Sequence, residues 1–446
     1  MNFLPFCVII GCGLLTAFPQ FFPCLKAYEN AAIPVFSFIV HRLRRVYCYD
    51  LFIIYHNSQE NGTPKQRPAE RMSNMKFHVN VNEINYGLGM VTRAIAVRPV
   101  KQAYECVMLE SNPEGLLLTC TDGEITIKTQ IASEIAEDGD ILLPARLLSE
   151  LMRRQSSGEA EIDIDDSGRA VIRASGSKTN MIGMSTEDFP LISDVSGGNV
   201  IVLSCGQLKN AISHVMFAVS NDESHKVLTG VLVESDRSET RLVGLDGFRL
   251  SLQCLSAGNE IPEGKDLVKA IVPGRIMNEL SKMLPDDNEK SVFLTFNQTH
   301  IMISFENVKV YTSLLTGEFI DYRHVLPTES STVVTVSKVP FLEALERCSL
   351  MAREGKNNLI TLDIQENILF MSSRAERGDV REEMPVLTQG SPLRISFNAN
   401  YLIDVIRNVI DDEMRMCFKT NISPCLVLPE EGNRYSYLVL PIRTFE

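Results

Sequence analysis

Three acidic turns are the first places where the residue types could support chemistry. The stretch DIDDSG (163–168) begins like an EF-hand calcium loop, but Ala174 occupies the twelfth position, where such a loop needs a bidentate carboxylate. Asp122 and Asp246 each precede a glycine, in CTDGE and GLDGF, and this pairing is typical of hairpin turns. We therefore expect structural turns, rather than calcium ligands or catalytic acids, at all three places.

The rest of the sequence has no pattern typical of a catalytic centre. The seven histidines are dispersed, and the chain contains neither a GxxxxGK phosphate loop nor a recognisable Ser/His/Asp arrangement. A hydrolase that used Asp122 or Asp246 would lack a partner base. The eleven cysteines include no CxxC pair, so we expect free, mostly buried thiols in a reducing compartment, with no metal and no cofactor. The sequence thus predicts a binding protein rather than an enzyme.

Basic residues recur on segments that read as helices, although the chain as a whole is acidic. Its 43 lysines and arginines and 56 aspartates and glutamates give a formal net charge of −13. This balance argues against a surface that binds nucleic acid everywhere, but one cationic face along the helices could still follow a polyanion. Scattered solvated side chains are the alternative. The positions concerned are Arg153, Arg154, Arg275, Lys282, Arg347, Arg353, Lys356 and Arg407.

An apolar stretch indicates a second kind of site. VGLDGFRLSLQC (243–254) reads as a strand, a turn at its Asp-Gly pair and a second strand, with Phe248, Arg249 and Leu250 directly after the turn. Either Phe248 and Leu250 belong to the core, or they form an exposed apolar surface beside an arginine. Such a surface would suit a short peptide with hydrophobic anchors.

An internal repeat sets the domain organisation. A short alternating strand that runs into an amphipathic helix occurs three times, and a second strand–helix unit follows each of them. The first units begin at Met75, Val200 and Val333, and the second at Ile141, Ala270 and Ile395. Equivalent residues in the second units are Pro144, Pro273 and Asn398. We therefore predict an α+β fold of three tandem two-helix, antiparallel-sheet domains, at 75–197, 198–328 and 329–446.

Residues 1–74 do not match this pattern. They contain apolar and aromatic runs interrupted by Pro19 and Pro23, and no positive segment precedes the first run, as a signal peptide would require. We expect these residues to lie outside the working fold. A membrane anchor, which the length alone permits, and an unusual folded extension are the alternatives.

Three motifs, placed in order along the repeat, resemble one known family. MKF at 75–77, LDGFRL at 245–250 and LVLPIR at 438–443, together with the threefold repetition, are similar to the bacterial DNA polymerase III beta subunits, the sliding clamps. This resemblance covers residues 75–446. It implies the DNA clamp fold and a head-to-tail dimeric ring, with helices facing duplex DNA and strands forming the outer wall. It also implies a cytoplasmic, non-catalytic processivity factor that acts by topological linkage instead of tight contact.

The same resemblance implies a peptide-binding cleft between the second and third domains, rimmed by Arg249 and Arg443. One subsite would consist of Leu228, Leu245, Gly247, Phe248, Arg249, Leu250, Ile320, His324, Val325, Leu438 and Leu440. The neighbouring subsite would consist of Asn398, Tyr401, Ile422, Pro424, Pro441, Ile442 and Arg443. The family commonly has histidine in place of Phe248 and proline in place of Ile320, and both changes keep the site apolar. The implied partners are the DNA polymerase III catalytic subunit, the clamp-loader complex, other polymerases, mismatch-repair proteins and ligase, all through linear motifs.

The resemblance and the helix charges together imply contacts with duplex DNA and with a second copy of the chain. The residues expected to contact DNA are Arg98, Arg153, Arg154, His225, Lys226, Arg275, Lys282 and Arg407. At the dimer interface, Met181 is expected to meet Leu350 and Met351 of the partner protomer. A membrane-tethered peptide-binding adaptor, built from the same three domains and anchored by residues 1–74, is the alternative function.

Overall fold

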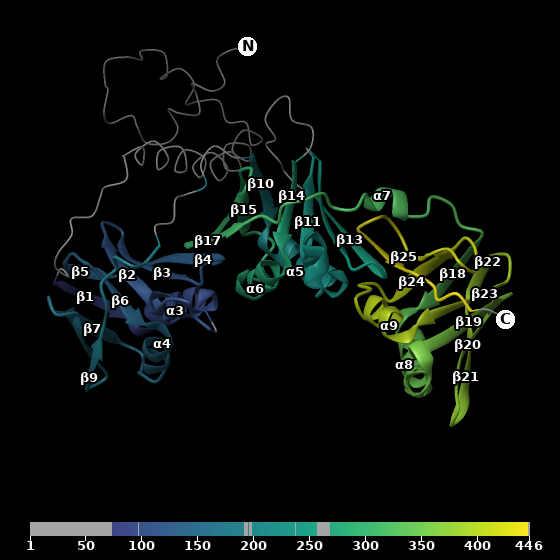
Figure 1. Cartoon of the computed structure of the whole chain (residues 1–446), viewed down its shortest axis with the longest axis horizontal. Coiled ribbons are helices and arrows are strands. Elements are labelled where there is room, and N and C mark those ends of the chain that lie inside the picture. The colour runs from purple at the N-terminus through teal and green to yellow at the C-terminus, as the bar shows by residue number, and fades with distance from the viewer. Residues whose placement is uncertain are drawn as a thin grey trace, which may run out of the picture. The chain divides into compact units, whose positions relative to one another are not determined.

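Three successive groups of strands and helices make up the described part of the chain in this computed structural model (Figure 1). The structure describes residues 74–96, 98–190, 195, 199–236, 238–256 and 268–444. The predictions for residues 1–73 therefore lie outside the described residues. Below, domains 1, 2 and 3 denote the predicted segments 75–197, 198–328 and 329–446.

Domain 1 starts with the predicted strand–helix unit. Met75, Phe77 and Val79 alternate toward the core, and the Asn80 side chain accepts a hydrogen bond from the Asn82 amide (2.9 Å) where the helix begins. The elements are β1 (Met75–Asn80), α3 (Val81–Val91), η3 (Thr92–Ala94), η4 (Gln102–Glu105), β2 (Cys106–Asn112), β3 (Gly115–Thr121), β4 (Ile125–Ile131), β5 (Glu134–Glu137), β6 (Asp140–Pro144), α4 (Ala145–Arg153), β7 (Glu159–Ile164), β8 (Arg169–Ala174) and β9 (Ser177–Ile182).

Domain 2 has the same two strand–helix units, with four described strands between its two long helices where domain 1 has five, and it adds a short helix before domain 3. At the first helix, the Ser204 hydroxyl accepts a hydrogen bond from the Gln207 amide (3.4 Å). The elements are β10 (Asn199–Ser204), α5 (Cys205–Val215), η5 (Met216–Ala218), η6 (Glu223–Thr229), β11 (Gly230–Ser235), β12 (Glu239–Leu245), β13 (Arg249–Ser256), β14 (Val268–Pro273), α6 (Gly274–Met283), β15 (Ser291–Phe296), β16 (His300–Phe305), β17 (Val308–Ser313) and α7 (Tyr322–Val325).

Domain 3 shows the same pair of strand–helix units. Pro144, Pro273 and Asn398 are each the cap residue immediately before the second helix of their domain, which confirms their predicted equivalence. The elements are β18 (Thr332–Ser337), α8 (Lys338–Glu354), η7 (Lys356–Asn358), β19 (Leu359–Gln365), β20 (Ile368–Ala375), β21 (Gly378–Pro385), β22 (Leu387–Gly390), β23 (Leu393–Asn398), α9 (Ala399–Arg407), β24 (Glu413–Phe418), β25 (Cys425–Pro429) and β26 (Tyr435–Val439).

Two antiparallel sheets cross from one domain into the next. An eight-stranded sheet has the order β10-β15-β16-β17-β4-β3-β2-β6, so it joins domains 2 and 1 where β17 pairs with β4. A nine-stranded sheet, β14-β11-β12-β13-β26-β25-β24-β18-β22, joins domains 2 and 3 where β13 pairs with β26. The other two sheets, β5-β1-β7-β8-β9 and β21-β20-β19-β23, place β9 and β21 at sheet edges.

Each helix pair packs on strands of its own domain (Figure 1): α3 contacts β4, α5 contacts β13, and α8 contacts β20. One large apolar core runs through domains 1 and 2, and a second fills domain 3. A smaller apolar cluster lies where domains 2 and 3 meet, and we call it the junction cluster. Its buried members are Leu228, Leu232, Val243, Leu245, Leu250, Leu252, Ile271, Tyr322 and Leu438.

Candidate functional site

The β12–β13 turn places an aromatic side chain at the surface. The Asp246 Oδ1 atom accepts hydrogen bonds from the amides of Phe248 and Arg249, both at 2.9 Å. Gly247 has a φ of +89°, which favours glycine, and a Cβ there would meet nothing within 4 Å. The Asp-Gly pair is therefore a hairpin turn, as predicted. Phe248 follows it with 54% of its surface exposed, so the core alternative is wrong for this residue.

Phe248 and Tyr401 connect the two predicted subsites. Their ring centroids lie 5.2 Å apart with an interplanar angle of 18°, so the rings stack between domains 2 and 3. The Phe248 carbonyl also accepts a hydrogen bond from the Leu440 amide (2.9 Å). The stack and this hydrogen bond fix the turn against domain 3.

Arg249 is a cross-link between domains rather than the predicted exposed rim. Its Nε atom lies 3.0 Å from Asp246 Oδ2, and its Nη1 atom is paired with Asp404 of α9. The guanidinium also lies over the rings of Tyr401 and Phe217, 5.0 and 5.6 Å from their centroids. Only 14% of the side chain is exposed, because carboxylates and rings from both domains surround it.

Much of the predicted first subsite belongs to the junction cluster beneath the turn. The predicted residues buried there are Leu228, Leu245, Leu250 and Leu438. Leu250 and Leu438 expose 0% and 1% of their surface, so Leu250 is a core residue. Val325 and Leu440 pack against the cluster and are only partly buried. A peptide at this surface would therefore touch Val325 and Leu440 before any of the buried leucines.

The predicted second subsite surrounds the start of α9 and the end of the chain. The Asn398 side chain accepts a hydrogen bond from the Asn400 amide (2.9 Å), and the Ile442 amide donates to the Ser396 carbonyl (2.8 Å). Ile422 exposes 56% of its surface. Pro424 and Pro441 are half-buried, and Arg443 is exposed.

The remaining predicted cleft residues lie on or beside α7. Ile320, just before the helix, exposes 45% of its surface. His324 is exposed, and its Nδ1 atom lies 2.8 Å from Asp321 Oδ2. Val325 is the last residue of the helix and packs on the junction cluster.

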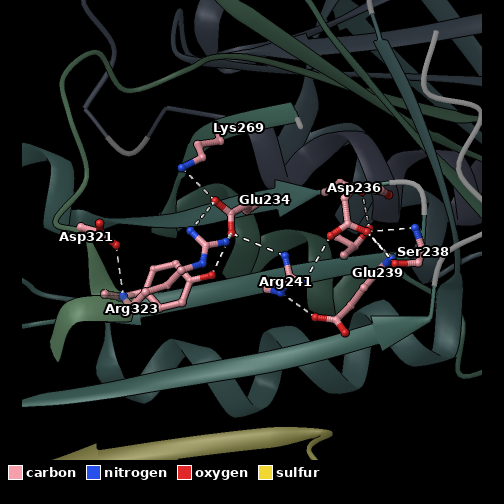
Figure 2. Close-up of polar contacts among 11 residues, drawn as sticks. Glu234, Asp236, Ser238, Glu239, Arg241, Lys269, Asp321 and Arg323 are labelled. Atoms are coloured by element: carbon pink, nitrogen blue, oxygen red, sulfur yellow. Dashed lines mark hydrogen bonds and ion pairs between the residues drawn. The ribbon is translucent and has the colours of Figure 1, made fainter. Parts of the chain in front are cut away.

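A buried carboxylate of the neighbouring strand binds α7 (Figure 2). Glu234 of β11 has no exposed side-chain surface, and its Oε2 atom accepts a hydrogen bond from the Tyr322 hydroxyl (2.8 Å). Arg323 and Lys269 also bind this carboxylate. Burial raises the Glu234 pKa, but hydrogen bonds from Lys269, Tyr322 and Arg323 outweigh it and keep the pKa below its ordinary value.

All eight residues predicted to contact DNA are exposed: Arg98, Arg153, Arg154, His225, Lys226, Arg275, Lys282 and Arg407. Two of them are paired with carboxylates on the helices, at 2.7 Å each: Lys282 with Glu279 and Arg407 with Glu346. Within the described part of the chain, Arg153 lies beyond ion-pairing distance of any carboxylate, and the same holds for Arg98, Arg154 and Lys226.

Arg275 also connects domains 1 and 2, which was not predicted from the sequence. Its guanidinium is paired with Asp122 and Glu124, which lie in the β3–β4 turn of domain 1. Arg93 of domain 1 is similarly paired with Glu279 of α6 (3.1 Å). These pairs link domain 1 to α6. The carboxylates of Asp122 and Glu124 therefore partly neutralise the charge of Arg275.

The residues predicted for the dimer interface differ in exposure. Met181 of β9 exposes only 4% of its surface, whereas the adjacent Ile182 exposes 77%. Successive residues of a strand face opposite sides, so Met181 points into domain 1 and Ile182 takes the exposed position. Leu350 of α8 exposes 64%, and Met351 is half-buried.

The DIDDSG stretch forms a turn, as predicted. The Asp165 Oδ1 atom accepts hydrogen bonds from the amides of Ser167 and Arg169, both at 3.0 Å. Hydrogen bonding, chiefly from the Ser167 hydroxyl, keeps the Asp165 pKa below its usual value. Among the described residues, no group of three or more His, Cys, Asp or Glu side chains is placed to hold a metal ion.

The described cysteines are free thiols, as predicted: Cys106, Cys120, Cys205, Cys254, Cys348, Cys417 and Cys425. Five of these seven are buried. Burial is the main reason that the pKa rises to about 11 for Cys205 and Cys348 and to about 12 for Cys254. The remaining cysteines belong to residues 1–73, outside the described residues.

The membrane anchor considered as an alternative also falls on residues outside the described ranges. Within those ranges, no helix combines the length and apolar character needed to cross a membrane.

Phe217, Asp404 and Glu234 take part in this site but were not predicted from the sequence. Asp404 and its partner Arg249 are 155 residues apart, and Glu234 and Tyr322 are 88 residues apart, so no local pattern links them. One signal was available for Asp404. It lies three residues after Tyr401 on a predicted helix, a spacing that places both side chains on one helix face.

Comparisons with protein families match nearly all of the described chain. The N-terminal, central and C-terminal domains of the DNA polymerase III beta subunit match residues 75–193, 202–321 and 323–443, respectively. The beta sliding clamp of Bacillus subtilis is 29% identical over 382 residues, which is 83% of this chain and 100% of that protein. The beta sliding clamp of Staphylococcus aureus is 28% identical over 381 residues, with the same coverage of 83% and 100%.

Solved structures show the same likeness. The crystal structure of the DNA polymerase sliding clamp from Bacillus subtilis aligns with a TM-score of 0.79 at 28% identity, covering 84% of this chain and 100% of that chain. The DNA polymerase III beta subunit from Thermotoga maritima aligns with a TM-score of 0.76 at 25% identity, covering 83% and 100%.

Proposed function

Because the chain belongs to the DNA polymerase III beta subunit family, the sliding clamps, we propose that it encircles duplex DNA and tethers a replicative polymerase to it. The observation that carries this proposal is the tandem match of three beta-subunit domains, together with two sheets that continue across both domain junctions. The chain is then a non-catalytic processivity factor that acts in the cytoplasm, where bacterial DNA is replicated.

In this proposal, two protomers join head to tail into a ring. The edge strands β9 and β21 support the arrangement, because edge strands in contact with a partner leave no unpaired sheet edge. Ile182 at one end, and Leu350 with Met351 at the other, supply apolar surface. Met181 then supports Ile182 from within domain 1 instead of contacting the partner.

The helices would face the DNA, with weak phosphate contacts that permit sliding. Arg153, Arg154, Arg98 and Lys226 support this role best, since each is exposed and none is ion-paired within the described part of the chain. His225, next to Lys226 in the sequence, is also exposed. Arg275, Lys282 and Arg407 are each paired with carboxylates, which would weaken their attraction for phosphate.

The surface around Phe248 would bind the partner proteins. Phe248, Ile320 and Ile422 are exposed apolar side chains there, and such side chains suit hydrophobic peptide anchors. Partners would be the DNA polymerase III catalytic subunit, the clamp-loader complex, other polymerases, mismatch-repair proteins and ligase. We use "the cleft" for this surface and for the residues predicted to line it.

The Phe248→Asp variant tests the cleft. A charge in place of the exposed ring should weaken binding of a dye-labelled peptide with leucine and phenylalanine anchors by at least about tenfold, measured by fluorescence anisotropy. Sedimentation should show an unchanged dimer. Leu387→Asp is the matched control, because Leu387 exposes 68% of its surface on β22, four strands away from β26. Equal affinity of Phe248→Asp and the unaltered protein would refute the cleft.

A further inference from the structure

The segment between β17 and β18 carries three of the cleft residues but contains no strand. Backbone hydrogen bonds hold its two ends, from the Leu315 amide to the Ile271 carbonyl (2.9 Å) and from the Ser331 amide to the Phe418 carbonyl (2.8 Å). Between these points, in residues 316–330, the described backbone–backbone hydrogen bonds join residues of the segment to one another. Side chains must therefore fix α7 against the sheet of domain 2.

Glu234 supplies the directional part of this attachment. Its carboxylate accepts the Tyr322 hydroxyl at 2.8 Å and binds the Arg323 guanidinium through both oxygens, with Nη1 3.3 Å from Oε1. The guanidinium lies 4.9 Å from the centroid of the Tyr322 ring. One buried carboxylate thus holds two consecutive residues of α7, and the next two, His324 and Val325, are cleft residues.

The apolar contacts of α7 do not supply the same restraint. Tyr322 and Val325 pack on the junction cluster, but apolar packing is not directional, whereas charge-assisted hydrogen bonds fix both distance and angle. Glu234 itself has no exposed surface, so it cannot touch a bound peptide. Any influence of Glu234 on peptide binding must therefore be indirect, and α7 is an element that Glu234 binds directly and that carries the cleft residues His324 and Val325.

Other charges of the network provide an internal control. Arg241 lies 3.7 Å from Glu234 Oε2, and its Nε atom is 2.6 Å from Glu239 Oε1 (Figure 2). Glu239 therefore belongs to the same network, but its ion pair joins β12 residues and does not involve α7. Loss of the Glu234 charge would leave Arg323 near Arg241 and Lys269 without the shared carboxylate.

We propose that Glu234 is a positioning residue of the cleft, which sets the place of α7 through Tyr322 and Arg323 and thereby sets the affinity for peptides with hydrophobic anchors. This inference rests on the proposed function, since it assumes that the cleft binds such peptides. It assigns a binding role to a residue that lies beneath the cleft and outside every contact that a peptide could make.

The test compares Glu234→Gln with Glu239→Gln in the full chain. The probe is a dye-labelled hexapeptide that ends in Leu-Ala-Leu-Phe, titrated by fluorescence anisotropy, while sedimentation reports the dimer. Glu234→Gln should weaken peptide binding about tenfold with the dimer intact, because three hydrogen bonds from α7, one from Tyr322 and two from Arg323, lose their charged acceptor. Glu239→Gln should stay within about twofold of the unaltered protein.

A double-mutant cycle distinguishes positioning from general destabilisation. If Glu234 acts through α7, its substitution should cost less affinity when Val325→Ala has already removed a cleft side chain of α7, so the two losses should be less than additive. Fully additive losses, equal losses in Glu234→Gln and Glu239→Gln, or no loss in Glu234→Gln would each overturn the proposal.

A milder variant covers the case in which Glu234→Gln does not fold. Tyr322→Phe removes one hydrogen bond to Glu234 without leaving a buried charge unpaired, and we expect about threefold weaker peptide binding. An unchanged affinity in Tyr322→Phe would then reject the proposal. Failure of the unaltered protein to bind the peptide would instead reject the proposed function, so the two failures are distinguishable.

Discussion

At the tip of the β12–β13 hairpin, two neighbouring residues lie in opposite environments. Phe248 is half exposed, while Arg249 is enclosed by Asp246, Asp404 and aromatic rings. Removing a guanidinium from water is costly unless carboxylates compensate it, and these two carboxylates do so. The backbone next to Phe248 is consequently held in place by these contacts of Arg249. A rigid aromatic side chain loses little conformational entropy when a peptide binds against it.

Asp236, in the β11–β12 turn, is a residue whose contribution to folding stability should depend clearly on pH. Hydrogen bonds to its carboxylate, the strongest from the Ser238 backbone amide, lower the pKa of Asp236 to about 2. Its charged form therefore stabilises the folded state above the unfolded pKa of about 4, and this stabilisation is lost as the pH falls through about 2. We expect Asp236→Asn to lower stability at pH 7 by about 1 kcal/mol after allowance for solvent screening.

Thermal unfolding between pH 7 and pH 2 measures this effect. The difference between Asp236→Asn and the unaltered protein should shrink as the pH falls from about 4 to about 2. Glu431→Gln, at an exposed carboxylate in the β25–β26 loop, is the control and should show little change. A difference for Asp236→Asn that stays constant down to pH 2 would contradict the assignment.

At the scale of elements, the sequence predicts the strand–helix units because their determinants are local. Alternation in 75–79 places every second side chain in the core, and Pro144, Pro273 and Asn398 mark where second helices begin. The Asp-Gly turn is predicted for the same reason, since backbone conformation at Gly247 depends on the residue itself.

Properties that depend on distant elements were not predictable from local pattern. Met181 and Ile182 are both apolar, and only the pairing of β9 with β8 shows which of them faces the core. Likewise, an arginine that follows a turn is expected to be exposed. Arg249 is instead enclosed, because α9 places Asp404 next to its guanidinium. The proposed position of the cleft comes from the family resemblance, whereas the exposure of each of its residues depends on tertiary structure and could not be read from the sequence.

The β12–β13 turn itself can be tested with a glycine substitution. Gly247→Ala introduces a Cβ at a φ of +89° in open space, so its cost is backbone strain of about 1 kcal/mol. Because the strain moves Phe248, we expect weaker peptide binding together with a lower melting temperature.

Gly432→Ala is the matched control for this substitution. Gly432 has a φ of +76°, and a Cβ at this position would also meet nothing within 4 Å, but the residue lies in the β25–β26 loop. Both variants should lose similar stability in thermal unfolding, and only Gly247→Ala should lose peptide affinity in fluorescence anisotropy. A similar loss of affinity in both would show that the turn has no special connection with the cleft.

At the scale of the whole molecule, an acidic chain can still attract DNA if its positive residues share a face. The net charge of −13 repels DNA on average, so the proposed contacts with phosphate would depend on a few arginines and lysines that carboxylates do not neutralise. Arg153 is exposed at the end of α4 without such a partner among the described residues, while Arg275 is paired with Asp122 and Glu124.

This contrast predicts different salt dependences for two alanine variants. Arg153→Ala should reduce the slope of log affinity against log salt by about one for a short duplex, because one phosphate contact is lost. Arg275→Ala should change the slope less and lower the melting temperature more, since it breaks pairs between domains 1 and 2. Equal slopes for Arg153→Ala and the unaltered protein would remove Arg153 from the DNA contacts.

A ring holds DNA by closure, so retention should depend on the topology of the DNA rather than on its sequence. If the protein is the proposed ring and a clamp loader places it on a nicked circular duplex, the DNA offers no end from which the ring could slide off, and weak phosphate contacts would suffice for long residence. Cutting that circle once with a restriction enzyme changes neither its length nor its composition. We therefore expect gel filtration in moderate salt to show the protein retained on the circle and lost from the cut DNA. Blocking the ends of the cut DNA with bulky end-bound proteins should restore retention, because sliding is the route of loss. Equal loss from circular and cut DNA would mean that contact, not closure, holds the protein in place.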